Sequence, residues 1–291
     1  MTLVASKQRN RGQLRKPVLI LLLVGLVGCE ATDRSAPARP GASDAGSEMV
    51  GWWQFEEGSG NTVADSSGSG NTATIYDGGW SSGRSGAGLQ MNGGNDSIVV
   101  VPVSESLKST GDAITVMAWT YRTAEHNVAV VAHNYPALFF GFHGPQFKWQ
   151  IRSTGSFLTR AVRKLGPIHR ITRSFGYPPP SEAACYVEPI DPAVLDRWIH
   201  VAGTFDGSRA RLYVDGIEIC DQPFPGPIGM SDAPFTISGY LDEVGDIVDE
   251  ITGKLDDVRV YGRALSETEI RAVYAEGADS APLLQNGDRG R

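Results

Sequence analysis

Residues 198–220 read WIHVAGTFDGSRARLYVDGIEIC, a stretch that places two tight-turn signals between short apolar runs. Asp206-Gly207 and Asp215-Gly216 are Asp-Gly pairs, which favour the two-residue turns of β-hairpins. Between them, residues 209–214 (RARLYV) alternate polar and apolar side chains with the period of a β-strand. The segment therefore predicts three antiparallel strands joined by two tight turns.

The same pattern extends over most of the chain. Further short apolar runs flanked by turn residues predict strands at residues 97–101, 114–121, 128–132, 138–142 and 148–151. Glycine supplies 35 of the 291 residues, well above the usual ~7%, which favours frequent tight turns. No stretch between residues 50 and 260 shows an apolar stripe at helical spacing, so we expect an all-β body.

One short helix is expected near the carboxyl end. Residues 266–269 (SETE) form a capping box, in which Ser266 caps the first turn and Glu269 reaches back to it. Gly277 is expected to end this helix. Apolar residues that then share one helical face are Ile270, Val273 and Tyr274.

Length and charge limit the class of protein. With 291 residues, 41% of them hydrophobic and 20% charged, the chain suits one large globular domain with appendages. The net charge of −7 argues against nucleic acid as a partner. We expect the domain to occupy residues 49–277 and to be followed by a flexible tail at 278–291.

The amino-terminal residues resemble a targeting signal. A basic leader without acidic residues precedes an apolar run of 11 residues, Val18 to Gly28, which is the layout of a secretory signal and is too short to span a bilayer. Residues 26–29 (LVGC) resemble the lipobox of bacterial lipoproteins. This resemblance implies a signal peptide at residues 1–28 and a lipid anchor on Cys29; a plain secretory signal with a chance cysteine is the alternative.

The resemblance to lipoproteins also implies a location. Glu30 stands where an aspartate tends to retain such proteins in the inner membrane, so we expect an outer-membrane protein of the cell envelope. Two or more acyl chains make anchoring to the membrane stable. Residues 29–48 are expected to form a flexible tether, since residues 30–48 contain no large apolar side chain.

Two further cysteines, Cys185 and Cys220, remain in the chain. Exported proteins fold in an oxidising compartment, where an even pair of cysteines favours a disulfide. Two free buried thiols are the alternative. Metal binding is not expected here, because two cysteines alone supply too few ligands for a structural zinc site.

A series of short motifs carries a family resemblance. The motifs are WQFEEGSG at 53–60, DSSGSGN at 65–71, LQMNGGND at 89–96, the strand at 114–119, the strand and turn at 198–207, LYVDG at 212–216, GKLDDVRVY at 253–261 and RALS at 263–266. In this order they resemble the laminin-G-like domains of the concanavalin A-like lectin/glucanase superfamily, over about residues 49–276. The resemblance implies a two-sheet jelly-roll sandwich. Residues 153–192, approximately, then form an insertion that is longer than the connection usual in this family.

Related folds include glucanases, whose retaining members need two carboxyl groups about 5–5.5 Å apart. The nearest acidic run, residues 242–250 (DEVGDIVDE), has the wrong spacing and is expected to lie in a loop. The five histidines form no metal-binding motif, and no Gly-x-Ser-x-Gly sequence marks a nucleophile. We therefore expect that the protein is not an enzyme.

The family resemblance also implies a structural calcium ion, because relatives often carry one on the sandwich. Calcium prefers carboxylate and carbonyl oxygens, often from glycine-rich turns. The candidate ligands are Asp96 and Asp257, followed by Glu56, Asp65 and Asn71. Alternatively, these are surface or turn residues whose side chains bond to the nearby backbone.

Aromatic rings and basic residues are the candidates for ligand binding. A ring face can stack on a sugar, and Trp52 and Trp149 are the candidate platforms, with a core position as the alternative. No acidic residue occurs between positions 126 and 181, whereas this stretch contains seven Lys and Arg residues. Such a basic insertion favours an acidic glycan, a phosphate-bearing lipid or an acidic protein surface, and a solvated loop is the alternative. The candidate residues in it are Arg160, Arg163, Arg170 and Arg173.

We therefore expect a lipid-anchored protein of the cell envelope whose laminin-G-like domain binds carbohydrate or another ligand without catalysis. A structural or protein-interaction module of the envelope is the second interpretation, and a glycoside hydrolase is the third. An exposed Trp or Tyr platform beside polar groups would favour carbohydrate. Buried rings with an exposed basic loop would favour a protein partner.

Overall fold

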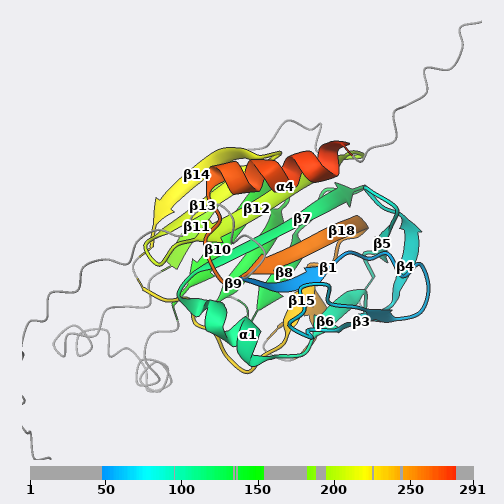
Figure 1. Ribbon diagram of the computed structural model, residues 1–291. Coiled ribbons are helices and arrows are strands. Elements are labelled where there is room, and N and C mark those ends of the chain that lie inside the picture. Colours follow the sequence, from blue (N-terminus) through cyan, green and yellow to red (C-terminus); the bar gives the residue numbers. More distant parts are fainter. Residues whose placement is uncertain are drawn as a thin grey trace, which may run out of the picture. The chain divides into compact units, whose positions relative to one another are not determined.

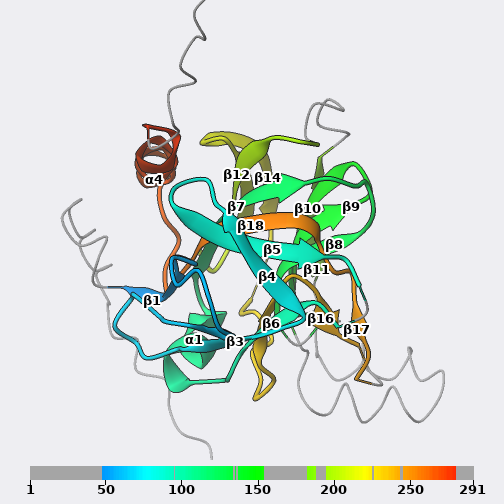
Figure 2. The same ribbon diagram turned by 90° about the vertical axis from the view of Figure 1, so that its right-hand side faces the viewer.

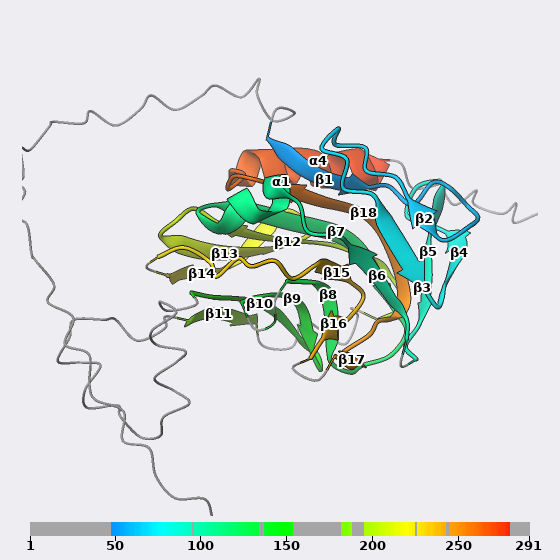
Figure 3. The ribbon, with the colours of Figure 1, turned by 90° about the horizontal axis from the view of Figure 1, so that it is seen from below.

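Strands make up most of the described chain, and they pair into two large antiparallel sheets that lie face to face (Figure 3). The computed structural model describes residues 48–153, 182–187 and 195–279, apart from residues 95, 134, 136, 225, 243 and 244. All of these residues belong to one compact unit. The predicted two-sheet jelly-roll sandwich is therefore confirmed.

Sheet A contains the strands that were expected from the opening segment. Its order is β14 (Ile217–Pro223), β13 (Arg209–Val214), β12 (Trp198–Phe205), β7 (Ile114–Arg122), β18 (Thr252–Tyr261), β5 (Ala87–Asn92) and β4 (Gly78–Ser82), with β1 (Met49–Trp53) also paired to β18.

Sheet B lies opposite. Its order is β11 (Glu182–Val187), β10 (Gln146–Arg152), β9 (Leu138–His143), β8 (Val128–His133), β15 (Phe235–Ile237), β6 (Ile98–Val101), β3 (Ala73–Tyr76) and β2 (Thr62–Val63). A small hairpin of β16 (Tyr240–Leu241) and β17 (Ile247–Val248) lies where the acidic run was expected to form a loop.

The turns of the opening segment form as their residues predict. In the first turn, Asp206 Oδ1 accepts hydrogen bonds from the backbone N–H groups of Ser208 (2.9 Å) and Arg209 (2.8 Å). In the second, Asp215 and Gly216 have φ values of 49° and 76°, the positive values that a type I′ turn requires. The predicted three-strand meander β12–β13–β14 is confirmed.

The space between the sheets is filled by the inward side chains of both. In β7, Ile114, Val116 and Ala118 face this core, while Met117 on the other face belongs to a second apolar cluster. This two-sided burial explains why β7 is apolar on both faces. A single helical turn, α1 (Glu105–Lys108), followed by the 3₁₀ turn η1 (Ser109–Gly111), interrupts the all-β body and is too short to show a helical stripe.

The helix α4 (Glu267–Asp279) packs on the outer face of sheet A, as Figures 1 and 2 show. Its capping box is confirmed, because Ser266 Oγ accepts from the N–H of Glu269 (3.3 Å) and Glu269 Oε2 accepts from the N–H of Ser266 (2.8 Å). Nowhere in the described ranges is a helix both long and apolar enough to cross a membrane.

The prediction that Gly277 ends this helix is wrong, because α4 continues through it to Asp279. The reason for the glycine is packing. A Cβ at position 277 would lie 2.4 Å from Nε1 of Trp119 in β7, so only glycine lets the helix approach the sheet this closely.

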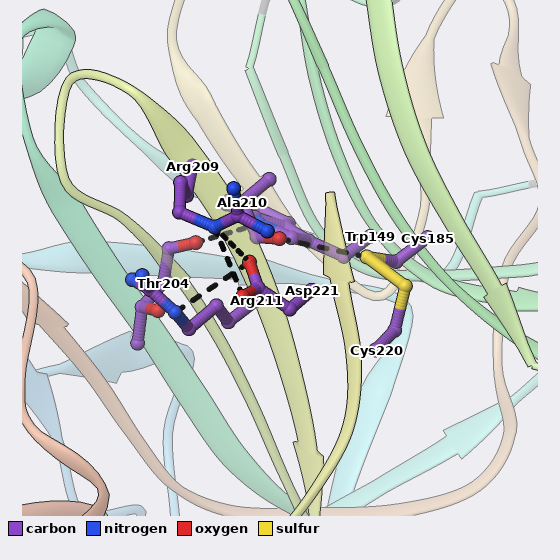
Figure 4. The surroundings of a disulfide bond; sticks show 8 residues. All are labelled: Trp149, Cys185, Thr204, Arg209, Ala210, Arg211, Cys220 and Asp221. Atoms are coloured by element: carbon purple, nitrogen blue, oxygen red, sulfur yellow. Dashed lines mark hydrogen bonds and ion pairs between the residues drawn. A yellow bond between two sulfur atoms is a disulfide. The ribbon is translucent and has the colours of Figure 1, made fainter. Parts of the chain in front are cut away.

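The predicted disulfide between Cys185 and Cys220 is confirmed, with the two Cα atoms 5.8 Å apart (Figure 4). Cys185 lies on β11 at one edge of sheet B, and Cys220 lies on β14 at one edge of sheet A. The bridge therefore joins the two sheets along one side of the sandwich. Part of the expected insertion is also regular, since residues 182–187 form β11 against β10.

Candidate ligand-binding face

The outer face of sheet B carries the candidate site, and strand alternation decides which side chains reach it. In β9 the residues Leu138, Phe140 and Phe142 point into the core, so Phe139 points outward. In β10 the core residues Phe147, Trp149 and Ile151 leave Lys148 on the outer face. Gly141 of β9 pairs with Lys148 on one side and with Ala129 of β8 on the other, so small residues border the lysine.

A backbone reversal brings a second aromatic residue to this face. After β15 the chain turns at Ser238 and Gly239, whose φ values are 62° and 122°. Both N–H groups bond to β8, Ser238 to the carbonyl of Val130 (3.1 Å) and Gly239 to that of Ala129 (2.8 Å). Tyr240 then begins the β16–β17 hairpin, which lies on the outer side of sheet B beside β8 (Figure 3).

Three aromatic rings meet there. Tyr135, from the β8–β9 connection, stacks on Tyr240 with ring centroids 4.0 Å apart and an interplanar angle of 21°. Phe139 meets both edge-on, at 5.8 Å from Tyr135 and 6.2 Å from Tyr240. Phe139 is buried, whereas Tyr135 is 37% exposed. We call Tyr135 and Tyr240 the tyrosine platform; its base is fixed by Phe139, and it reaches solvent.

Charged groups surround the platform. Lys148 Nζ lies 5.0 Å from the centre of the Phe139 ring. Burial raises the pKa of Asp249, and the nearby side chains of His143, Lys148 and His126 oppose that shift. Burial, then the charge of Asp249, raises the pKa of Tyr240, so its hydroxyl keeps its proton and remains a donor. The face therefore offers hydrogen-bond donors and an acceptor beside an aromatic surface.

Trp52 and Trp149 were the two predicted aromatic platforms. The prediction for Trp149 is wrong, because this residue is buried. The ring is 0% exposed, its Nε1 donates to the carbonyl of Thr204 (3.1 Å), and a Cβ on Gly203 would lie 2.7 Å from it. Figure 4 shows it beside the disulfide. A ring enclosed in the core has no free face for a sugar, so Trp149 is a core residue.

Trp52 lies on the other side of the molecule, on β1 of sheet A, and is partly exposed. Its Nε1 donates to Oδ1 of Asp257 (2.5 Å), and the guanidinium carbon of Arg259 lies 4.8 Å from the ring centre. Asp257 also pairs with Arg259, at 2.9 Å from Nη2 to Oδ2. Both oxygens of this candidate calcium ligand thus already accept from cationic or indole donors.

The candidate ligands Asp65 and Asn71 shape a turn. Asp65 accepts from the backbone N–H groups of Trp52 (3.0 Å), Ser67 (2.9 Å) and Asn71 (2.8 Å). Burial would raise the pKa of Asp65, but hydrogen bonds from the Ser67 side chain and from these N–H groups lower it below its ordinary value. Asn71 is buried, and its Nδ2 donates to the carbonyl of Val50. Both side chains bond to the nearby backbone. This is the role that was given above as the alternative to calcium binding.

The remaining two candidate ligands, Glu56 and Asp96, are exposed, and each lies in or contacts a loop. Glu56 Oε2 accepts from the N–H of Ala87 (2.9 Å), and Asp96 lies in the turn after β5. No three His, Cys, Asp or Glu side chains of the described ranges lie close enough together to hold a metal ion. The five predicted residues therefore do not gather at one calcium site, and the oxygens of Asp65 and Asp257 already accept from N–H donors.

Several predicted residues lie outside the described ranges. They are Cys29 with the signal and tether, and the basic residues Arg160, Arg163, Arg170 and Arg173. The candidate site also contains residues that were not predicted from the sequence: Tyr135, Phe139, Lys148, Tyr240 and Asp249. The alternation of β9 was the one signal that could have placed Phe139 on the outer face.

The comparisons with known proteins agree with this architecture. Residues 174–271 match the family model described as the concanavalin A-like lectin/glucanases superfamily. The domain therefore has a two-sheet jelly-roll fold, and part of its sequence is similar to this superfamily. No curated protein sequence matches the chain.

Solved structures with this jelly roll include several binding domains. The binding domain of Paraclostridial Mosquitocidal Protein 1 has a TM-score of 0.59 at 14% identity, over 79% of this chain and 52% of that one. The binding domain of botulinum neurotoxin serotype G has a TM-score of 0.57 at 14% identity, over 81% and 54%. The chain thus spans about half the length of these toxin domains.

A third structure is covered almost completely. Domain 4 of AbnA, a GH43 extracellular arabinanase from Geobacillus stearothermophilus, in complex with arabinotriose, has a TM-score of 0.53 at 15% identity. The match covers 78% of this chain and 98% of that domain. At such low identity, these likenesses establish a shared fold.

Proposed function

We propose that this concanavalin A-like domain is a non-catalytic glycan-binding module whose contact surface is the tyrosine platform. The observation that carries the proposal is the stacked, solvent-reaching pair Tyr135 and Tyr240. Ligand sites typically combine aromatic surface with a few placed polar groups. This is also the arrangement that the sequence analysis named as favouring carbohydrate over a protein partner.

Each group of the face has a role in such binding. The C–H face of a sugar ring packs on the exposed face of Tyr135, because tyrosine presents an apolar body with a polar tip. The hydroxyl of Tyr240 donates to a sugar oxygen, and the carboxylate of Asp249 accepts from sugar hydroxyls. Lys148 is buried and adds positive charge beside Phe139. The arabinotriose complex of the AbnA domain supports the proposal, since that domain has the same fold.

The test measures binding to immobilised and soluble glycans, including arabinan oligosaccharides and an acidic polysaccharide, by affinity electrophoresis and calorimetry. Tyr135→Ala and Tyr240→Ala should each weaken binding by about tenfold or more, which corresponds to about 1.4 kcal/mol. Tyr135→Phe should keep most of the affinity, because the ring face remains.

Tyr76 supplies the matched control. It also lies on sheet B and is 52% exposed, but on β3. Tyr76→Ala should therefore leave glycan binding unchanged. Equal losses for Tyr76→Ala and Tyr135→Ala, or no glycan binding by the wild-type protein, would contradict the proposal.

We also propose that a lipid on Cys29 holds the domain at the outer membrane of the cell envelope. The support is the order of basic leader, short apolar run and LVGC sequence at residues 26–29. Cys29→Ala should leave the precursor unprocessed and change its partitioning into detergent. A variant that is processed and partitions like the wild type would refute this part of the proposal.

A further inference from the structure

A pocket of about 170 Å³ lies beside Trp52 on the outer side of sheet A, away from the tyrosine platform. Its walls come from β1, from the turn between β4 and β5, from β7 and β18, and from the end of α4. At about 30 Å³ per water molecule, the space holds five or six waters. The pocket is therefore large enough for a small polar molecule and too small for a drug-sized one.

The walls are fixed by contacts on both sides. The guanidinium carbon of Arg84 lies 4.7 Å from the ring centre of Trp119, and its Nη2 donates to the carbonyl of Ala278 (3.0 Å). On the opposite wall, Arg259 lies over Trp52 and pairs with Asp257. A preformed pocket costs little to order when a ligand enters it.

Two carboxyl groups are held in the pocket by a glycine-rich turn, residues 83–88. Asp256 Oδ2 accepts from the N–H groups of Arg84 (2.7 Å) and Ser85 (3.1 Å), and Glu56 Oε2 accepts from that of Ala87. A Cβ at Gly86 would lie 2.4 Å from the same Glu56 oxygen. The turn thus approaches the carboxyl groups closely and keeps them in place as acceptors.

The charges of the lining indicate the class of ligand. Four carboxyl groups and two guanidinium groups line the pocket, so an anion would meet more acidic than basic groups even where Asp256 is protonated. A cation would instead meet two guanidinium groups that already stack on the two indoles. Trp119 is 3% exposed and, within the described chain, its Nε1 donor has no partner. Aromatic walls, fixed acceptors and available donors suit a neutral molecule rich in hydroxyl groups.

We propose that this pocket is a second binding site, which takes a single neutral sugar unit or a polyol of similar size. The edge of Trp52 forms one wall, Glu56 and Asp256 accept from hydroxyl groups, and Arg84 donates to a sugar oxygen. The proposal goes beyond the glycan-binding tyrosine platform and does not rest on it, because the two sites share no residue.

The test uses the full chain and saturation-transfer NMR with glucose, galactose and mannose, and with glucuronic acid and glucosamine as charged comparators. We expect the neutral sugars to bind in the millimolar range that is usual for so few ligand atoms. Ser85 is exposed at the pocket, so Ser85→Trp should fill the space and weaken their binding by about tenfold or more. Ser59→Trp, at another exposed serine, should not.

A second variant, Glu56→Gln, keeps the test decisive if Ser85→Trp does not fold. Glu56→Gln keeps an oxygen for the N–H of Ala87 but loses the charged acceptor, so it should also weaken binding while leaving the melting temperature close to that of the wild type. Binding that survives both Ser85→Trp and Glu56→Gln, stronger binding of a charged comparator, or no binding of any neutral sugar would overturn the proposal. Loss of these sugars in Tyr135→Ala alone would assign them to the tyrosine platform instead.

Discussion

Replacing Cys185 and Cys220 together by alanine should lower the stability of the domain while both sheets still form. The bridge closes a loop with a sequence separation of 35 residues. Each cysteine also lies on a strand that pairs with its neighbour without the bridge, β11 with β10 and β14 with β13. The main loss is therefore the constraint on the unfolded chain and not the pairing of the folded one.

The chain-entropy relation gives the size of the effect. For 35 residues, the entropy lost by the unfolded chain corresponds to about 3.8 kcal/mol at 25 °C. Domains of this size lose roughly 2–4 °C of melting temperature per kcal/mol, so the double variant should melt about 8–15 °C lower than the wild type. Residual structure in the unfolded chain reduces this figure, which is therefore an upper bound.

Differential scanning calorimetry of the wild type, the double variant and the chemically reduced wild type measures the shift. The reduced protein and the Cys185→Ala/Cys220→Ala variant should agree. Cys29→Ala changes the third cysteine of the chain and should leave the melting temperature unaltered. A double variant that melts within about 2 °C of the wild type would refute the argument that loop closure stabilises the sandwich.

Two further predictions concern the outer side of sheet A. Gly277→Ala should destabilise the domain by about 1–3 kcal/mol in chemical denaturation, because the added Cβ lies 2.4 Å from Trp119 Nε1, although alanine is the better helix former; an unchanged or more stable variant would contradict this packing. Burial raises the pKa of Asp256 to about 7, so the folded protein keeps a proton that the unfolded chain loses near pH 4. Wild-type stability should therefore fall relative to Asp256→Asn as the pH rises from 4 to 7, by up to about 4 kcal/mol; parallel stability curves for the two proteins would exclude this shift.

Local signals in the sequence predicted much of the fold because the interactions behind them are local. The Asp215-Gly216 turn needs only two residues with positive φ, and the capping box needs only Ser266 and its neighbour three positions on. The disulfide was predicted from the oxidising compartment expected for an exported protein and from the even number of remaining cysteines. Gly277 shows the limit of local signals. A glycine near the end of a helix looks the same in the sequence whether it ends the helix or lies against an indole from a distant strand.

Trp149 could have been assigned to the core from the sequence. It shares its parity in the strand with Phe147 and Ile151, whereas Lys148 and Gln150 occupy the other face. Its residue type favoured a sugar platform, and the alternation of the strand was the stronger evidence. The same rule separates Trp53, which is 1% exposed, from its partly exposed neighbour Trp52.

The tyrosine platform could not be predicted in this way. Tyr135 and Tyr240 lie far apart in the chain and outside the long strands, and the pairing of β8 with β15 brings their segments together. The turn at Ser238 and Gly239 then decides that Tyr240 lies over the outer face of sheet B. The pairing of β8 with β15 is not encoded in the residues next to the two tyrosines, and Gly239 beside Tyr240 signals a turn but not its direction.

The position of α4 explains why the two proposed sites differ in kind. The helix buries Met117, Ala202 and Tyr213 on the outer face of sheet A, and a small pocket lies where the helix ends. On sheet B the tyrosine platform lies on the outer face and reaches solvent, which suits contact along an extended chain of sugars. Since the sites lie on opposite outer faces, a module that used both would join two glycan segments that approach from opposite sides. Binding at one site should then leave the other available, and a soluble neutral sugar that fills the pocket should not displace a polysaccharide held by the platform.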